Sequence, residues 1–520
     1  MRIFYPLAHI DCGQGGIVLS RKLPIFYSAL LLTGVNLLLR FVSTAFSVYL
    51  SGRIGASGIG LLQLVMSVGM LATTAGVAGV RTATMYLTAE ELGRKRPERV
   101  IWVLSGCCVY SLLTGGGVSV LLRLFAPFIA RHWIADPQTE DAIRLFSGFL
   151  PVSCLCGVMV GYFTAAGRIG TLAAVEVAEQ LCTMVITIGL LSFWAGRDPQ
   201  RACMAVIAGS GIGACLTLGC LTILRAREKA PSGPRIPVTR RLLNTAVPLA
   251  LADDLKSGIS TAENLMVPKR LALNPHITDP LAAFGRVCGM VFPVIMFPAA
   301  IVFGLAELLI PELARCAAAG SKQRILYLSK RSLKASLLYG CLLGGLIYLC
   351  AEGLCLRLYH SMEASSFMRL YALLIPMLYC DAITDAMTKG LGQQKACVRY
   401  NILTSSMDVV FLYLLLPRFG MMGYFWSFFV THLVNFVLSL RRLIKITGRI
   451  VSIKTFLQAL AATAFSVFVG AMMPASALRP LCFLLLFSAA SVLVGAFGKE
   501  DILWLKGLAN PSRNPKKKRP

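Results

Sequence analysis

Apolar runs of about 20 residues recur along this 520-residue chain from Ile25 to Gly498. A helix of that length crosses about 30 Å of hydrocarbon, and a backbone in lipid must pair its polar groups internally. Hydrophobic residues make up 56% of the chain and charged residues only 14%, whereas roughly 25% are charged in an ordinary soluble domain. A water-soluble core could not hide so much apolar surface. The sequence therefore predicts an all-α polytopic membrane protein.

The number of apolar runs predicts about fourteen transmembrane helices. Their approximate bounds are 25–50, 59–88, 100–122, 142–166, 170–194, 202–224, 242–266, 282–310, 333–351, 369–390, 400–417, 422–440, 455–473 and 479–498. We do not interpret the first run as a cleaved signal peptide, because no small-residue cleavage site and soluble domain follow it. Residues 1–24 are then expected to form a cytoplasmic extension.

Lys and Arg lie mostly in short loops between the apolar runs and give the chain a net charge of +27. Alternate loops are basic, at 91–99, 225–241, 322–334 and 441–454, and the tail ends in Lys516-Lys-Lys-Arg519. The positive-inside rule places these loops and both termini on the cytoplasmic side of the cell membrane. The charge thus indicates membrane orientation and contact with membrane lipids, and we expect no nucleic-acid partner.

The chain also predicts two six-helix bundles related by an internal repeat. Phe163 to Gly170 precedes an apolar helix containing Glu176 and Glu179, and Thr388 to Lys395 opens a similar helix about 225 residues later. The expected parts are an N-terminal extension (1–24), a first bundle (25–224), a basic cytoplasmic linker (225–241), a second bundle (242–440), two extra helices (441–498) and a basic cytoplasmic tail (499–520). Bundles related in this way can rock against each other in a transporter.

No metal, cofactor or enzyme site is predicted. The 17 cysteines lie mostly within apolar runs and form no pattern of zinc spacing. The pairs Asp253-Asp254 and Asp381-x-x-x-Asp385 resemble the Mg²⁺-diphosphate motifs of membrane prenyltransferases, but Ser257 follows Lys256 where such a motif continues with acids. No Walker A, G-x-S-x-G or H-E-x-x-H sequence is present. A membrane prenyl or glycosyl transferase stays a remote alternative.

Arg40 lies near the middle of the first apolar run, where an arginine costs at least about 2.5 to 3.5 kcal/mol unless it faces protein or water. A guanidinium can bind phosphate oxygens in pairs, and a low-dielectric cavity strengthens that contact. We therefore expect Arg40 to bind an anionic cargo in a polar cavity. A structural ion pair with Asp253 or Glu263 is the alternative.

Further cations are candidates for the same cavity. They are Arg53 at the outer end of the first helix, Arg81 in the second, Lys256 in the seventh and Arg270 at the end of the seventh. Arg53 and Arg270 lie at helix ends, where extension of the side chain to the membrane surface is the alternative. Arg81 could instead approach the cytoplasmic boundary.

The seventh span is the most polar one. At 3.6 residues per turn, Asp253, Lys256 and Ser260 share a face that must avoid lipid. The candidate acids for ion coupling or for the cavity are Asp253, Asp254 and Glu263 in this span, and Asp381 and Asp385, one turn apart in the tenth. The alternative for Asp253 is a private i,i+3 pair with Lys256.

Several motifs resemble a known family. They are the stretch Arg40 to Leu64, Ala89-Glu-Glu91, Val267-Pro-Lys-Arg-Leu271 and Leu309-Ile-Pro-Glu-Leu313. These are similar to the stage V sporulation protein B group of the multidrug/oligosaccharidyl-lipid/polysaccharide (MOP) exporter superfamily, which includes lipid II and polysaccharide flippases. The likeness covers essentially the whole chain and is most specific in the first ninety residues.

This resemblance implies an alternating-access flippase for a polyprenyl-pyrophosphate-linked sugar, with lipid II or a related polysaccharide precursor, in spore cortex synthesis for example, as cargo. It implies a monomer that works with cell-wall or spore-cortex enzymes. Lipid II flippases carry a second arginine and an aspartate farther along the first helix, where this chain has Phe46 and Ser47. Drug and cation antiporters of the superfamily, the main alternative, often place an acid in the first helix, where this chain has Arg40.

Cysteines introduced at positions 94 to 99 should react with a membrane-impermeant thiol reagent only from the cytoplasmic side. Cysteines at positions 270 to 280 should react only from outside, because the first loop is one of the basic ones. Labelling of intact cells and of inverted vesicles, with the exposed native cysteines replaced, measures both. The reverse pattern would invert the predicted topology.

Overall fold

The computed structural model describes residues 25–94, 96–195, 198–228, 237–448, 452–473 and 478–498. The predicted extension 1–24 and tail 499–520 lie outside the described residues, as do residues 229–236 of the predicted linker 225–241. Within the described ranges the chain is helical and contains no strand. The all-α prediction is therefore confirmed.

The helices follow one another with short connections. The first are α1 (Ile25–Val77), α2 (Val80–Gly93), α3 (Val100–Phe128), α4 (Glu140–Ala165), α5 (Ile169–Leu190), α6 (Pro199–Ala226) and α7 (Thr239–Leu271). The next are α8 (Pro280–Gly285), the π-helical segment η5 (Arg286–Val291), α9 (Phe292–Ala318), α10 (Lys322–Tyr359), α11 (Met362–Ala372) and α12 (Ile375–Gly390). The last are α13 (Gln394–Phe419), α14 (Met421–Thr447), α15 (Ile453–Met472) and α16 (Leu478–Leu493).

In the described part of the chain, ten helical segments are long and apolar enough to cross a membrane, or eleven if the bent pair α11 and α12 forms one span. One of the ten, Leu37–Gly93, contains part of the first predicted span (25–50) and all of the second (59–88). The polar helix α7 is not among the ten, and α16 is shorter. The chain is a multi-pass membrane protein, and the count of fourteen spans stays a prediction.

The first predicted division, between residues 50 and 59, coincides with a break inside α1. Gly55 has φ 72° and ψ −179°, a conformation that L-residues with a side chain rarely adopt. A second break follows α1, where Ala78 and Gly79 both have positive φ before α2 begins. The chain thus enters as one helix, turns at Gly55, and changes direction again before α2.

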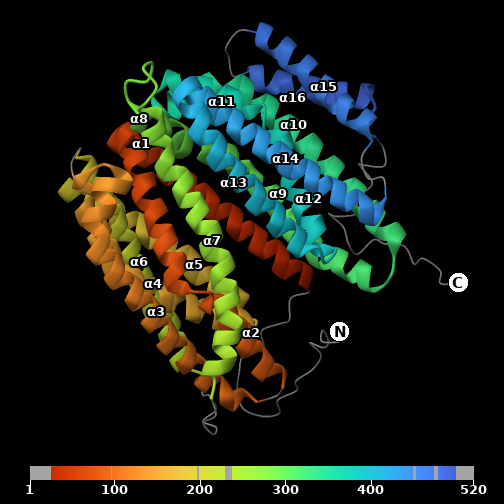
Figure 1. Ribbon diagram of the computed structural model, residues 1–520. Coiled ribbons are helices and arrows are strands. Elements are labelled where there is room, and N and C mark those ends of the chain that lie inside the picture. The colour runs from red at the N-terminus through yellow and green to blue at the C-terminus, as the bar shows by residue number, and fades with distance from the viewer. Residues whose placement is uncertain are drawn as a thin grey trace, which may run out of the picture.

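The helices pack in two groups (Figure 1). Helices α1 to α6 contact one another, and α9 to α14 form a second group, with α15 and α16 packed on α10. Helix α7 contacts α1 and α2 of the first group and α13 of the second, and α1 also contacts α8, η5 and α9. The two groups therefore meet mainly along α1 and α7. The internal repeat that the sequence predicts stays a prediction.

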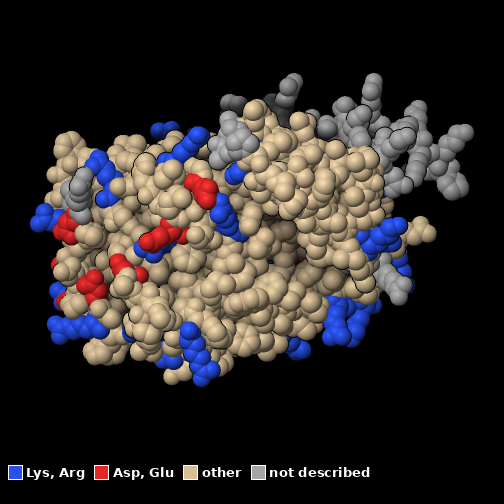
Figure 2. Space-filling model, turned by 90° about the horizontal axis from the view of Figure 1, so that it is seen from above, with Lys and Arg blue, Asp and Glu red and all other residues tan. Residues whose placement is uncertain are grey.

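Large apolar side chains cover much of the outer surface. Leu113, Val185, Phe468 and Leu485 are each exposed by more than 60%, on four different helices. Figure 2 shows a broad area without charged side chains, bordered by Lys and Arg. Such a surface suits hydrocarbon, with basic residues near the membrane boundaries.

Three glycines form a close crossing between α1 and the α8–η5 segment, which we call the glycine seam (Gly60, Gly285 and Gly289). A Cβ built at Gly285 would lie 2.0 Å from the Ala56 carbonyl oxygen, and one at Gly60 would lie 2.3 Å from the Leu281 carbonyl oxygen. A Cβ at Gly289 would lie 1.8 Å from a side-chain carbon of its α1 neighbour. Only glycine allows backbones to approach this closely.

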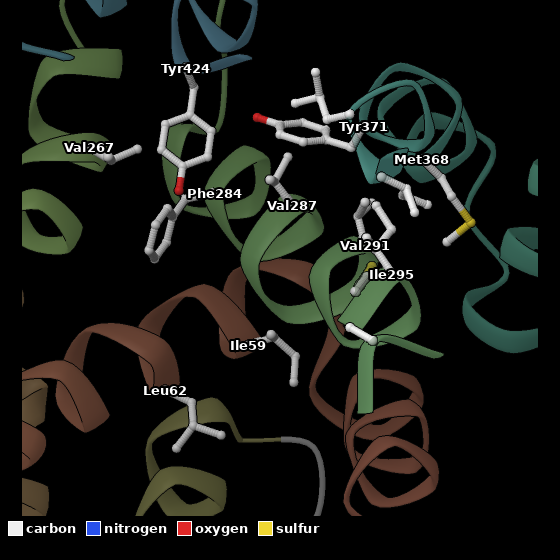
Figure 3. Packing of buried hydrophobic residues seen from close by; sticks show 14 of the residues in the cluster. Ile59, Leu62, Val267, Phe284, Val287, Val291, Ile295, Met368, Tyr371 and Tyr424 are labelled. Atoms are coloured by element: carbon white, nitrogen blue, oxygen red, sulfur yellow. The ribbon is translucent and has the colours of Figure 1, made fainter. Parts of the chain in front are cut away.

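The seam continues into the main apolar cluster. Figure 3 shows Val287, Val291 and Ile295 along η5 and α9, with Ile59 of α1 on one side and Tyr371 of α11 on the other. Beside the seam, the Ser57 hydroxyl donates to the Asp279 carboxylate at 2.6 Å, and the same carboxylate caps α8 by accepting from the Ala282 amide. Close packing at the glycine seam and the Ser57–Asp279 hydrogen bond thus hold α1 against the α8–η5 segment.

Gly285→Ala should lower the free energy of unfolding by about 1 to 3 kcal/mol, because the new methyl group must push α8 away from α1. Gly116→Ala, in α3, is the matched control, since its Cβ would meet nothing within 4 Å. Alanine favours a helix interior, so the control should be neutral or slightly stabilising. Thermal unfolding in detergent compares the two variants, and equal stability would contradict the close crossing.

Candidate functional site

A cavity of about 670 Å³ opens between the two helix groups. Its walls come from α1 and α5 of the first group and from α9 and α12 of the second. The polar side chains that line it are Arg40, Ser43, Gln180, Glu307, Asp385 and Lys389, and apolar residues such as Phe303 complete the wall. A polar cavity enclosed by apolar helices is the environment that the sequence predicts for Arg40.

Arg40 reaches from α1 across to α9. Its Nη1 donates to the Met296 carbonyl oxygen at 2.8 Å, and its guanidinium lies 5.2 Å from the centroid of the Phe303 ring. No ion pair links Arg40 to Asp253, Glu263 or another carboxylate among the described residues. Its remaining N–H groups border the cavity, so the guanidinium is anchored at one corner and still has donors for a ligand.

The second cation of the cavity is Lys389, near the end of α12. Its Nζ lies 2.6 Å from the Asp385 carboxylate, one turn earlier on the same helix. This pair is internally neutral, and Glu307 lines the cavity from the neighbouring helix α9. The cavity therefore holds cations and acids together. Lys389 pairs with a carboxylate, whereas Arg40 contacts a carbonyl oxygen and an aromatic ring.

Asp381 and Asp385 face different surroundings although they are one turn apart. Asp385 lines the cavity, whereas Asp381 is buried against α14 and accepts two contacts from the Asn435 amide, at 3.0 and 3.2 Å. Nδ1 of His432 lies 3.4 Å from Oδ2 of Asp381. The two predicted acids therefore have different partners: Asp385 faces the cavity, and Asp381 belongs to a buried polar cluster with α14.

Helix α7 does not line the Arg40 cavity. Asn264 and Thr261 donate to Ser67 of α1, so part of the polar face of α7 packs on the first group. Asp254 borders a separate cavity of about 500 Å³ between α7 and α13. Glu263 is partly buried, and Asp408 on α13 is close enough for the two negative charges to repel each other.

Asp253 and Lys256, by contrast, are exposed on α7. In the part of the chain that the structure describes, no ion pair joins them, although an i,i+3 pair is their predicted alternative. The polar stripe of α7 thus divides between α1, α13 and the surface.

The other predicted cations lie outside the cavity. Arg53 is exposed, and its Nε lies 3.3 Å from the Tyr49 hydroxyl on the same helix. Arg270 stacks 3.7 Å from the centroid of the Tyr413 ring and donates to the Tyr413 carbonyl from two of its nitrogens. Arg81 is exposed on α2. Arg270 thus ties α7 to α13, and the predicted cavity cations do not gather in this conformation.

Sequence reasoning did not select Lys389, Gln180, His432, Asn435 or Asp408 as site residues. His432 and Asn435 are polar residues within the apolar run 422–440, three positions apart and thus on one helix face. Polar residues on one face of a span are a signal of a buried cluster. That signal could have identified α14 as a partner of an acid, although not of Asp381 in particular.

The family model MatE matches residues 33–192. The chain is 22% identical to "Stage V sporulation protein B" of Bacillus subtilis (strain 168) over 410 residues, which cover 76% of this chain and 78% of that protein. The fold is similar to "Lipid II flippase MurJ, inward closed conformation", with a TM-score of 0.67, 12% identity, and coverage of 92% of this chain and 99% of that one.

A second solved structure has the same fold. It is "Inward-facing conformation of a multidrug resistance MATE family transporter of the MOP superfamily", with a TM-score of 0.64 and 14% identity, covering 80% of this chain and 100% of that one. The resemblance to the MOP superfamily is confirmed. Both solved structures are named as a transporter or a flippase, and neither is named as an enzyme.

Asn435→Ala should destabilise the protein by about 1 to 3 kcal/mol, because both oxygens of buried Asp381 lose their amide donor. Ser406→Ala is the control, since that exposed hydroxyl donates only to the Ile402 carbonyl of its own helix. Chemical or thermal unfolding in detergent measures the difference. Equal stability would mean that the Asp381 cluster contributes nothing to the second helix group.

Proposed function

We propose that this protein is an alternating-access flippase that moves a polyprenyl-pyrophosphate-linked sugar, such as lipid II or a related polysaccharide precursor, across the cytoplasmic membrane. The observation that supports it most directly is the position of Arg40. Its guanidinium faces a cavity between two helix groups, on a fold shared with a lipid II flippase. We further propose that both termini are cytoplasmic and that the protein works as a monomer near cell-wall or spore-cortex enzymes.

The chemistry of the cavity suits a diphosphate. A diphosphate with two ester links carries about two negative charges, and charge-assisted hydrogen bonds from arginine to phosphate oxygens are among the stronger ones in proteins. Arg40 supplies the first cation, and Lys389 supplies a second when a phosphate competes with Asp385 for its ammonium group. Lipid II flippases carry a second arginine in the first helix, where this chain has Phe46. Lys389 thereby offers a second positive charge from another helix.

The remaining predicted residues are proposed for other steps. Arg53, Arg81, Lys256 and Arg270 lie outside the cavity in this conformation, and we propose that they contact cargo as it enters or leaves. Asp253, Asp254, Glu263, Asp381 and Asp385 are proposed to take part in ion coupling. An ion gradient or a membrane potential, about 2.3 kcal/mol per charge for 100 mV, would supply the energy.

A MATE-type multidrug or cation antiporter is the second candidate. The MatE match to residues 33–192 and the presence of Glu307 and Asp385 in the cavity favour it. Arg40 disfavours it, because a cationic drug in the same cavity would meet a guanidinium that pairs with no carboxylate in the described part of the chain. The two candidates therefore differ in the sign of the charge on the cargo, and Arg40 attracts only an anionic cargo.

Purified protein in proteoliposomes should translocate labelled lipid II, and Arg40→Ala should reduce the rate at least about tenfold through loss of a charged hydrogen bond. The assay scores the exposure of lipid II to an impermeant modifying enzyme, with an imposed ion gradient or potential. Arg144→Ala is the matched arginine control, because Arg144 pairs with Glu140 on the exposed surface of α4.

Full translocation by Arg40→Ala would remove Arg40 from the mechanism. If the wild type moves no lipid II, other lipid-linked glycans should be tested in the same vesicles. Gradient-driven efflux of a cationic dye, with no movement of any lipid-linked glycan, would replace the proposal by the antiporter.

A further inference from the structure

The start of α9 is a segment in which two prolines each remove a backbone hydrogen-bond donor. Pro293 and Pro298 have no N–H, so the carbonyls of Gly289 and Val294, four residues earlier, lose their helical donors. The π-helical segment η5 immediately precedes them. Prolines and π-helical turns are both sites where helices bend. We call residues 289–298 the proline segment.

Side chains from three other helices donate to carbonyls of the proline segment. Ser47 of α1 donates to the Gly289 oxygen at 3.1 Å, which restores the partner that Pro293 removes. The other contacts are Arg40 to Met296 at 2.8 Å, Tyr379 of α12 to Ile295 at 3.3 Å and Tyr339 of α10 to Pro298 at 3.0 Å. The segment is therefore held by side chains as well as by its own helix.

These contacts divide into two kinds. Tyr339 and Tyr379 belong to the same helix group as α9, and their rings stack with centroids 5.8 Å apart. Ser47 and Arg40 belong to α1, in the other group. If the groups move against each other, the contacts from α1 must break, whereas the tyrosine contacts can persist.

Arg40 differs from Ser47 because its donor is charged and borders the cavity. A phosphate oxygen carries a formal charge and accepts a stronger hydrogen bond from guanidinium than a neutral carbonyl does. An anion entering the cavity therefore competes directly with the Met296 carbonyl for Nη1 of Arg40. Ser47, with a neutral hydroxyl, gains much less from such an exchange.

We propose that Arg40 is a cargo-responsive latch. It holds the proline segment of α9 against α1 until an anionic diphosphate draws its guanidinium away from the Met296 carbonyl. Binding of the cargo and release of the bendable helix are then one event. This inference rests on the proposed function and assigns Arg40 a role in the conformational change in addition to its role in binding.

Hydrogen–deuterium exchange of the peptides that cover the proline segment tests the latch in the purified full-length protein. Arg40→Gln should speed exchange there about tenfold without any ligand, since it removes a hydrogen bond from a charged donor. Ser47→Ala is the matched control, because it removes the neutral contact from the same helix. It should loosen the segment less.

Inorganic pyrophosphate is the probe for the response to an anion. It should speed exchange of the proline segment in the wild type and in Ser47→Ala, and should add nothing in Arg40→Gln. Exchange in α4, a helix of the first group that packs mainly on α2, α3 and α6, serves as the internal reference. Orthophosphate, with fewer oxygens to engage both Arg40 and Lys389, should act at higher concentration.

Two results would overturn the latch: unchanged exchange in Arg40→Gln, or a wild-type segment that does not respond to pyrophosphate. The translocation assay separates this failure from that of the proposed function. Translocation of a lipid-linked glycan without any change in α9 would remove only the latch. Release of α9 by pyrophosphate, with no lipid-linked glycan translocated, would remove only the flippase.

Discussion

A backbone polar group inside a membrane must find its partner within the protein, and much of this structure follows from that constraint. The prolines of α9 leave carbonyls without helical donors at the point where two helix groups meet. Ser47 of α1 donates to one of these carbonyls, that of Gly289, and Arg40, Tyr339 and Tyr379 donate to other carbonyls of the same segment. A bendable helix is thus stabilised by neighbours that belong to different groups.

The same constraint explains where charge is found. Arg40 is tolerated in the first span because it borders a cavity, where a carbonyl and an aromatic ring share its charge. Lys389 and Asp385 neutralise each other on the far wall, and this leaves Arg40 as the cation with the most to gain from an anionic ligand. The cavity is consequently poised for an anion although it also contains acids.

The glycine seam and the cavity share α1, and the α8–η5 segment of the seam continues into α9 of the cavity wall. Gly285 and Gly289 bring η5 onto α1, and the proline segment continues directly into the cavity wall. Packing at the seam needs no charge and does not depend on a ligand, whereas the Arg40 contact a few turns away does. A transporter built this way can respond to its cargo at the cavity while close packing sets the geometry of the seam.

The sequence by itself determined the fold class, the approximate helices and the conclusion that Arg40 must face protein. These depend on hydrophobicity and on the cost of a charge in lipid, which are local properties of the chain. Only the tertiary structure decided that Asp381 turns to α14 while Asp385 faces the cavity, and that Lys389 rather than a residue of α7 joins Arg40. The physical reason is that helical periodicity specifies which face a side chain occupies, but not which helix that face meets. That choice is made by packing between segments that are far apart in the sequence.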